Sequence, residues 1–277
     1  MREALLRVEA ACDLATRREA DPVSFVHRYE TLHDREIVAL LSSSFAFGNA
    51  KAFRVKIADA LSRLGPSPSS AADDPAKVRA QLKGFKHRLY DETHVTALLV
   101  GARKVQKKSG SLGQALAAEL EAHDDDLVAA LVAWTGAIRV AGGLDKLKGA
   151  GAAHILPNPG RGGATKRLML LLRWMARPAD GVDLGLWDLD ASRLVIPLDV
   201  HLHKLGRNLG FTSVKTANWK AALEVTDALR RFDPDDPTRF DFSLCHLGMV
   251  QRCPSRRDPE RCEGCGVKPV CRHWAGR

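Results

Sequence analysis

The sequence has no apolar run long enough to cross a membrane, which takes about 20 predominantly apolar residues. Its charged first stretch, residues 1–22, also lacks the uninterrupted apolar segment of a signal peptide. These two absences predict a protein of the cytoplasm that has no membrane partner. In that reducing compartment, cysteines are expected to bind metal in preference to forming disulfides.

The chain also lacks the alternating runs of Val, Ile, Thr and aromatic residues that β-strands need. Ala, Leu, Arg and Lys dominate at helical spacing, and there is neither an internal repeat nor a low-complexity linker. The pattern therefore predicts an all-α fold. Helices are expected near residues 2–18, 22–29, 34–44, 49–64, 74–83, 91–108, 112–121, 125–138, 164–176, 200–208, 217–230 and 237–249.

Cysteine is scarce, with six in 277 residues, yet four of them follow one another closely as C-x8-C-x2-C-x5-C. These are Cys253, Cys262, Cys265 and Cys271. Such spacing predicts a metal site, and by spacing alone Zn²⁺ and a [4Fe–4S] cluster are equally compatible with it. Cys12 and Cys245 stand outside the pattern, and we expect both to be small buried hydrophobic residues.

Acidic residues are outnumbered, at 33 against 42 Lys and Arg, which gives a net charge of +9. Residues 146–177 contain no Asp or Glu at all, and the segment after residue 252 is basic too. This excess favours a polyanionic partner. The basic residues of the first stretch are Lys146, Lys148, Arg161, Lys166, Arg167, Arg173 and Arg177.

A glycine-rich loop, residues 154–165, precedes Lys166 and an apolar helix. Glycines at such a turn let the backbone approach a ligand closely, and a helix N-terminus favours phosphate. Lys166 is expected in the first turn of that helix, beside Arg167 and apolar residues. These surroundings would disfavour its ammonium form and leave an amine able to attack carbon. The alternative is a surface lysine with a solvated head.

The third feature is the run Ile196-Pro-Leu-Asp-Val-His-Leu-His203. Asp199 is placed to cap the helix that follows, and a carboxylate fixed in this way can also stabilise a developing cation. His201 and His203 are two residues apart, so they point to different helix faces and are not expected to share a metal. We expect both to be structural.

Together, these features resemble the helix-hairpin-helix DNA glycosylase superfamily, which includes endonuclease III and the adenine and 8-oxoguanine glycosylases. The resemblance lies in the glycine-rich hairpin that ends in Lys166, the Pro-Leu-Asp-Val-His run and the four-cysteine segment. A little-characterised bacterial family is more similar still, over most of the chain. Its marks are Lys166–Met175, Val182–Trp187, Phe232–Pro237 and Phe240–Phe242.

The resemblance implies a two-lobed helical bundle over residues 1–251, with the pocket between the lobes, and a cluster loop over residues 252–277. It favours a [4Fe–4S] cluster over Zn²⁺. It implies that Lys166 is the nucleophile and that Asp199 is the carboxylate of a bifunctional glycosylase. The hairpin is longer than the usual form by Asn158-Pro159, and the first cysteine gap is eight residues where endonuclease III has six.

The same resemblance implies a monomer that binds duplex DNA with a damaged base, in association with the nucleoid. Its DNA contacts would come from Gly160, Arg161, Gly162, Gly163, Thr165 and Arg167. Ser44, Phe45, Phe47 or Asn49 would fill the gap left by a flipped base, with a core role as the alternative for the two phenylalanines.

The expected activity is therefore release of a damaged base, with an oxidised purine favoured, followed by strand cleavage through a lysine Schiff base. Two alternatives remain open. One is a DNA-binding protein that has this scaffold and no catalysis. The other is a glycosylase that acts on RNA or on another modified base.

Overall fold

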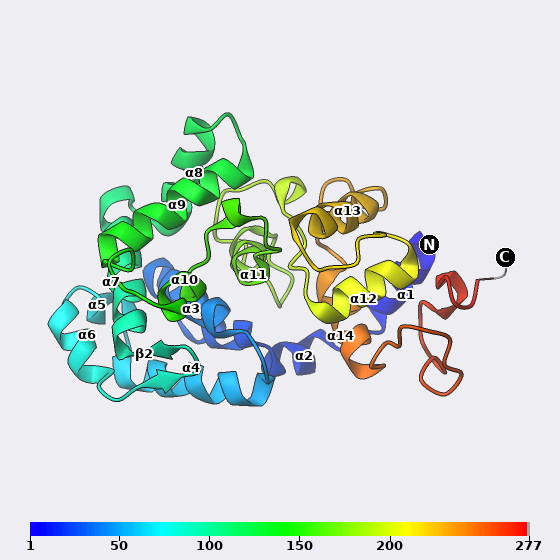
Figure 1. Cartoon of the computed structure of the whole chain (residues 1–277), viewed down its shortest axis with the longest axis horizontal. Coiled ribbons are helices and arrows are strands. Elements are labelled where there is room, and N and C mark those ends of the chain that lie inside the picture. The colour runs from blue at the N-terminus through cyan, green and yellow to red at the C-terminus, as the bar shows by residue number, and fades with distance from the viewer. Residues whose placement is uncertain (276–277) are drawn as a thin grey trace. The chain divides into compact units, whose positions relative to one another are not determined.

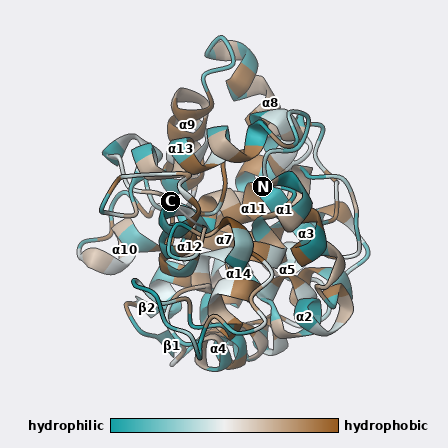
Figure 2. Cartoon of the chain, turned by 90° about the vertical axis from the view of Figure 1, so that its right-hand side faces the viewer, coloured by the Kyte–Doolittle hydropathy of each residue, from teal (hydrophilic) through white to brown (hydrophobic). Residues whose placement is uncertain are grey.

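The computed structural model describes residues 1–275, and the predicted all-α fold is confirmed, with 60% of the chain in helices and 2% in strands (Figure 1). No helix within this range is both long and apolar enough to span a membrane. The helical ribbons carry hydrophobic and hydrophilic stretches in alternation, as amphipathic helices do (Figure 2).

The chain divides into two compact units. Unit 1 comprises Met1–Arg17, Gly162–Arg173 and Asp190–Arg277, and unit 2 comprises Arg18–Arg161 and Trp174–Leu189. The described part of the four-cysteine segment thus falls in unit 1. A separate cluster loop that begins at residue 252 stays a prediction.

Unit 2 contains most of the helices and one short hairpin. Its β-strands, β1 (Lys86–His87) and β2 (Tyr90–Asp91), pair antiparallel. Its helices are the 3₁₀ helix Pro22–Arg28, α3 (Leu32–Phe45), α4 (Ala50–Leu64), α5 (Pro68–Ala71), α6 (Pro75–Gln81), α7 (Glu92–Ser109), α8 (Leu112–Ala122), α9 (Leu127–Gly142), α10 (Ala150–Ile155) and the 3₁₀ turn Pro159–Arg161.

Unit 1 is built on three consecutive helices near the end of the chain. These are α12 (Val200–Leu209), α13 (Trp219–Arg230) and α14 (Asp241–Val250), with α1 (Arg2–Ala10) packed against α14. Short 3₁₀ turns lie at Ala191–Arg193 and Lys268–Val270. The chain passes from one unit to the other four times: within α2 (Leu14–Ala20), between residues 161 and 162, within α11 (Lys166–Ala176) and between residues 189 and 190.

Short polar side chains fix where most helices begin, because each accepts a hydrogen bond from a backbone N–H of the first turn. Asp91 and His94 form a reciprocal capping box at the start of α7. The other capping residues are Thr31, Asn49, Ser67, Asp74, Ser111, Asp126, Asp199 and Asn218. These are the residue types that make helix starts readable from sequence.

Several expected boundaries were wrong. The single helix predicted over residues 2–18 is two helices, because the Asp13 carboxylate accepts from the Thr16 N–H at 3.1 Å and starts a new one. The stretch predicted as a helix over residues 22–29 is a 3₁₀ helix. The β1–β2 hairpin and α10 had no predicted counterpart.

Of the described helices, α7 and α9 in unit 2 make the most extensive contact; Figure 1 labels both. Gly101 of α7 lies against the backbone of Ile138, and Gly142 of α9 lies against that of Ala97. A Cβ atom at either glycine would collide with the facing helix backbone. The two glycines therefore permit the close approach, as small residues do at helix crossings.

A buried carboxylate holds unit 2 together around this pair. Glu36 of α3 has no exposed surface. It accepts from the Gln106 side chain at 2.7 Å and from the Trp187 indole at 2.7 Å. It also accepts from the first backbone N–H groups of α8, at Leu112 (2.8 Å) and Gly113 (3.0 Å). One side chain thus satisfies four donors from α7, α8 and residue 187.

Replacing Glu36 with Ala should lower the free energy of unfolding of unit 2 by about 3–5 kcal/mol, because it leaves several buried donors without an acceptor. Urea unfolding followed by tryptophan fluorescence measures this loss. The matched control is Glu121→Ala on the exposed side of α8, which should change stability by less than about 0.5 kcal/mol. Equal, small effects of the two variants would contradict the role given to Glu36.

Candidate functional site

The lysine and the aspartate singled out in the sequence meet in unit 1. Nζ of Lys166 lies 3.6 Å from Oδ2 of Asp199. Lys166 is the first residue of α11, and Asp199 immediately precedes α12, 33 residues later. The side chain of Asp199 is 12% exposed and that of Lys166 is 35% exposed. A cation and an anion thus face each other where solvent can still reach the lysine.

The capping role predicted for Asp199 is confirmed. Its Oδ1 accepts from the N–H groups of His201 at 2.9 Å and Leu202 at 2.8 Å. The approach to the cap is fixed as well, because the buried Ile196 donates its N–H to the hydroxyl of Thr226 on α13 at 3.1 Å. These contacts set the direction of the carboxylate before any ligand binds.

Helix α11 is held in place by a second ion pair on the same face as Lys166. Arg173 lies seven residues after Lys166, two helical turns along, and forms a buried ion pair with Asp241 of α14. Its guanidinium also stacks over the ring of Phe242. Arg173 and Arg177 belong to the basic stretch that favoured a polyanionic partner, but both are buried. Arg177 pairs with Asp180 and Asp183 in unit 2.

The residue before Lys166 has an unusual backbone. Thr165 has a φ of +44°, a conformation that is costly for a β-branched residue. Its carbonyl accepts from the N–H groups of Leu168 at 2.9 Å and Met169 at 3.1 Å. The strained residue therefore provides the first hydrogen-bond acceptor of α11. Its buried hydroxyl has no hydrogen-bond partner in the described part of the chain. Strained backbone of this kind is enriched at functional sites.

The hairpin residues expected to contact DNA are accessible. Gly160, Arg161, Gly162 and Gly163 are exposed, whereas Thr165 and Arg167 are half-buried. The added Asn158 forms a tight turn, in which its side chain accepts from the Gly160 N–H at 2.9 Å. Gly162, with a φ of +75°, accepts from the Trp219 N–H at 3.1 Å at the start of α13.

The four residues considered for the gap of a flipped base lie in unit 2 in different surroundings. Asn49 is exposed and caps α4, with its side chain 3.1 Å from the Ala52 N–H. Phe47 is half-buried, and Arg88 lies over its ring. Ser44 and Phe45 are buried, and Phe45 packs in the core. Of the four, Asn49 and Phe47 have surface that a partner could touch.

The two histidines after Asp199 differ from each other. His203 is buried, and its Nε2 lies 3.0 Å from the Val214 carbonyl, so the structural role expected for it is confirmed. His201 is exposed, so the expectation that it is structural was wrong. Lys204 and Arg207 are exposed on the same side of α12.

The charges of the four C-terminal cysteines affect one another's pKa. Burial raises the pKa of the Cys253 thiol, a hydrogen bond from the Asn208 amide at 3.3 Å opposes that rise, and the charges of the other three cysteines add to it. Burial likewise raises the pKa of Cys265 and of Cys271, while backbone N–H groups at residues 267, 268 and 273 oppose it. The four thiols therefore lie within electrostatic range of one another.

Within residues 1–275, no group of three or more His, Cys, Asp or Glu side chains is already arranged to hold a metal ion. The chemistry of the donor set still fits a thiolate-bound metal centre. It consists of sulfur atoms alone, and N–H groups are directed at three of them, as around bound metal-sulfur clusters. The choice between iron–sulfur and zinc stays a prediction.

The eight-residue first cysteine gap packs against the end of the described chain. The guanidinium of Arg257 lies 4.2 Å from the ring centre of Trp274, and Nζ of Lys268 lies 4.5 Å from it. Arg261 pairs with Asp258 within the gap at 3.6 Å. Arg257 and Arg261 thus make contacts within this segment, whereas Arg256 is exposed and has no partner among residues 1–275.

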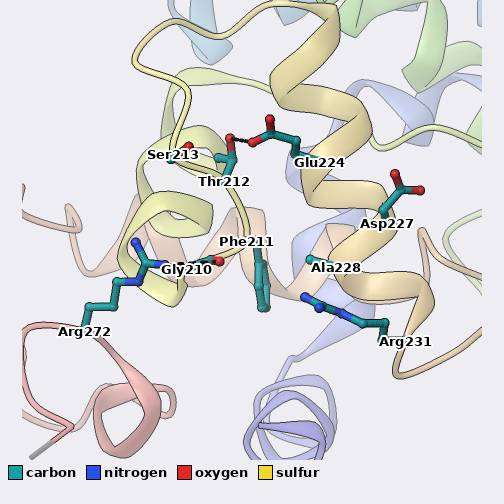
Figure 3. Close-up of a pocket in the computed structure, with 9 residues that line it drawn as sticks. All are labelled: Gly210, Phe211, Thr212, Ser213, Glu224, Asp227, Ala228, Arg231 and Arg272. Atoms are coloured by element: carbon teal, nitrogen blue, oxygen red, sulfur yellow. Dashed lines mark hydrogen bonds between the residues drawn. The ribbon is translucent and has the colours of Figure 1, made fainter. Parts of the chain in front are cut away.

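A shallow pocket of about 570 Å³ opens at the other end of α12 from Asp199 (Figure 3). Phe211 and Ala228 lie at its base, and Arg231 and Arg272 flank it. Its acidic side chains are Glu224, which accepts from Thr212 at 2.6 Å, and Asp227, which pairs with Arg230. The ten residues of α12 separate this pocket from Asp199 by about 15 Å.

One residue of the site was not identified from the sequence. Cys245 of α14, expected to be a buried hydrophobic residue, is half-buried and places its Sγ 3.7 Å from Oδ2 of Asp199. The two residues are 46 positions apart, and nothing in the local pattern links them.

Two substitutions separate the contribution of Asp199 to stability from any contribution to chemistry. Asp199→Ala should lower the free energy of unfolding by about 1 kcal/mol, because α12 loses its cap, whereas Asp199→Asn keeps a capping oxygen and should stay close to the parent. Denaturant unfolding of both variants measures the difference. Equal losses in the two variants would mean that charge, and not capping, is what Asp199 contributes to stability.

Comparison with known proteins gives one match. Residues 21–250 match the family described as "Protein of unknown function (DUF2400)". No curated protein and no solved structure matches the chain. The matched region includes Lys166, Asp199 and Cys245 and ends before Cys253. Because the match covers most of the 277 residues, the chain belongs to the DUF2400 family.

Proposed function

We propose that this protein is a DNA repair glycosylase with lyase activity, which removes a damaged base from duplex DNA. The observation that carries the proposal is the 3.6 Å approach of Lys166 and Asp199, an amine and a carboxylate fixed at the starts of two helices. Breaking a glycosidic bond and trapping the sugar needs these two groups, one anionic and one nucleophilic. The helix-hairpin-helix resemblance agrees with the same assignment.

Exposed cations would bind the phosphate backbone. On α12, Lys204 and Arg207 are exposed at helical spacing, with the exposed His201 three residues before Lys204, and none of the three forms an ion pair with another residue between positions 1 and 275. Arg161 and the glycines of the hairpin are exposed beside the start of α11, whose N-terminal N–H groups favour phosphate. Binding of this kind is independent of sequence and weakens as salt rises.

The chemistry would begin with a damaged base turned out of the duplex. As the bond between C1′ and the base breaks, its electron pair leaves with the base, and positive charge grows on the sugar. Oδ2 of Asp199 would stabilise that charge, since the cap already holds Oδ1. The departing base takes up a proton and leaves neutral.

Lys166 would then form the covalent intermediate. Its proton passes to solvent, and the neutral Nζ attacks C1′. Nζ then loses one proton, O4′ takes one up as the C1′–O4′ bond breaks, and the nitrogen lone pair forms the C1′–Nζ double bond of a protonated Schiff base. Loss of a proton from C2′ then expels the 3′-phosphate, whose oxygen takes the electron pair of the C3′–O bond. The strand is cut, and hydrolysis of the imine frees Lys166.

The substrate favoured is an oxidised purine, because the 33-residue spacing from Lys166 to Asp199 resembles that of the archaeal 8-oxoguanine glycosylases. A protein with this activity would work as a monomer on the nucleoid in the cytoplasm.

A panel of duplexes, each with one damaged base, tests the activity. The parent should release at least one lesion, while Lys166→Ala should lose strand cleavage and Asp199→Asn should lose base release by on the order of 100-fold or more. Lys220→Ala, an exposed lysine on α13, is the control and should match the parent. A parent that binds DNA and releases no base from any duplex would contradict the proposal and leave a non-catalytic DNA-binding protein.

We further propose that Cys253, Cys262, Cys265 and Cys271 hold a [4Fe–4S] cluster. When bound, the cluster would stabilise the fold of residues 252–275 and take no part in the steps above. Asn208 would orient the first ligand through its hydrogen bond to Cys253, and Arg257 and Lys268 would fix the loop through Trp274.

Protein purified without oxygen should be brown and contain about four iron atoms per chain. Cys265→Ala should lose the colour and most of the iron because it removes one ligand, whereas Cys12→Ala should keep both. Metal analysis and visible absorption measure the outcome. A colourless parent with stoichiometric zinc would contradict the iron–sulfur assignment and leave the alternative zinc site.

A further inference from the structure

The carboxylate of Asp199 has a third partner besides its cap and Lys166. The thiol of Cys245 donates to Oδ2 at 3.7 Å, and Oδ2 is also the oxygen that faces Nζ of Lys166 at 3.6 Å. The other oxygen, Oδ1, takes both N–H groups of the cap. The two oxygens therefore have separate partners, and Cys245 lies on the reactive side.

The packing of α12 against α14 brings the thiol to this position. Gly248, three residues after Cys245, faces the start of α12, where an added Cβ would lie 3.5 Å from Cβ of His201. Arg173 anchors α14 to α11 through Asp241. The position of Cys245 is thus set by three helices.

The thiol matters most when Lys166 moves. In the mechanism proposed above, Nζ leaves Oδ2 to bond with C1′, and Oδ2 then loses its cationic partner. The cap still holds Oδ1, but it leaves the carboxylate free to twist about that contact. Among residues 1–275, Cys245 would then be the donor that keeps Oδ2 directed at the sugar.

A thiol suits this task better than a stronger donor would. A lysine or arginine at this position would cancel the negative charge that must stabilise the cationic sugar. The S–H group is neutral and a weak donor, so it orients the carboxylate and leaves its charge available.

We propose that Cys245 is a positioning residue of the site, which keeps Oδ2 of Asp199 aligned while Lys166 reacts. This inference rests on the proposed function. It adds to that function a side chain from α14, which neither the sequence pattern nor the resemblance indicated.

Three variants test the inference on a duplex from which the parent releases a base. Cys245→Ala should lower kcat on the order of fivefold to tenfold, with KM unchanged, because DNA binding does not use the thiol. Cys245→Ser, which keeps a donor, should restore most of kcat. Cys12→Ala, at another half-buried cysteine of unit 1, is the control and should match the parent. A Cys245→Ala variant with the parent's kcat, or equal losses in the Ala and Ser variants, would overturn the inference.

A second measurement does not depend on activity. The infrared S–H stretch of Cys245, isolated by subtracting the spectrum of Cys245→Ala, should move to higher frequency in Asp199→Asn, because a neutral amide accepts more weakly than a carboxylate. A band at the same frequency in the parent and in Asp199→Asn would overturn the contact. A band that moves in a protein that releases no base would support the contact and count against the glycosylase proposal alone.

Discussion

Two N–H groups at the start of α12 hold one oxygen of Asp199, and the arrangement of the whole site depends on this contact. A capping carboxylate is fixed by the backbone, so its second oxygen has a defined direction without any ligand. That direction is toward Lys166 and Cys245. The capping contact that starts α12 thereby also orients the carboxylate that we propose stabilises the charge on the sugar.

In each unit, buried polar contacts also fix how neighbouring helices pack. In unit 1, the Arg173–Asp241 pair joins α11 to α14, so the helix that begins with Lys166 is fixed two turns further along. In unit 2, Glu36 collects donors from α7, α8 and residue 187. Such groups cost stability if any partner is lost, so they also specify a single arrangement of the helices.

Much of the helical framework could be predicted from sequence, because its signals are local. Caps such as Asn49 and Asp199 and terminators such as Gly65 mark helix ends wherever the helix packs. The hairpin of β1 and β2 has two residues in each strand, too few to show alternation. The break after α1 depends on Asp13. From sequence alone, Asp13 is equally compatible with a capping position and with the interior of one long helix.

The site was less accessible to sequence reasoning. The pairing of Lys166 with Asp199 was expected only through a resemblance, since 33 residues separate them. Cys245 had no signal, because its partner lies 46 residues away and a cysteine is commonly a small core residue. Arg173 and Arg177 contributed to the basic stretch of residues 146–177, and the sequence did not show that each is buried in an ion pair with an aspartate.

The central claim is that Lys166 attacks the sugar beside Asp199, and the most direct measurement is the position of the covalent bond. Borohydride reduces a Schiff base to a stable amine, so a reaction with duplex DNA that contains an abasic site should leave a sugar remnant on the protein. Mass spectrometry of the digested adduct should place that remnant on Lys166. A remnant on another lysine, or none in a protein that binds the duplex, would contradict the account.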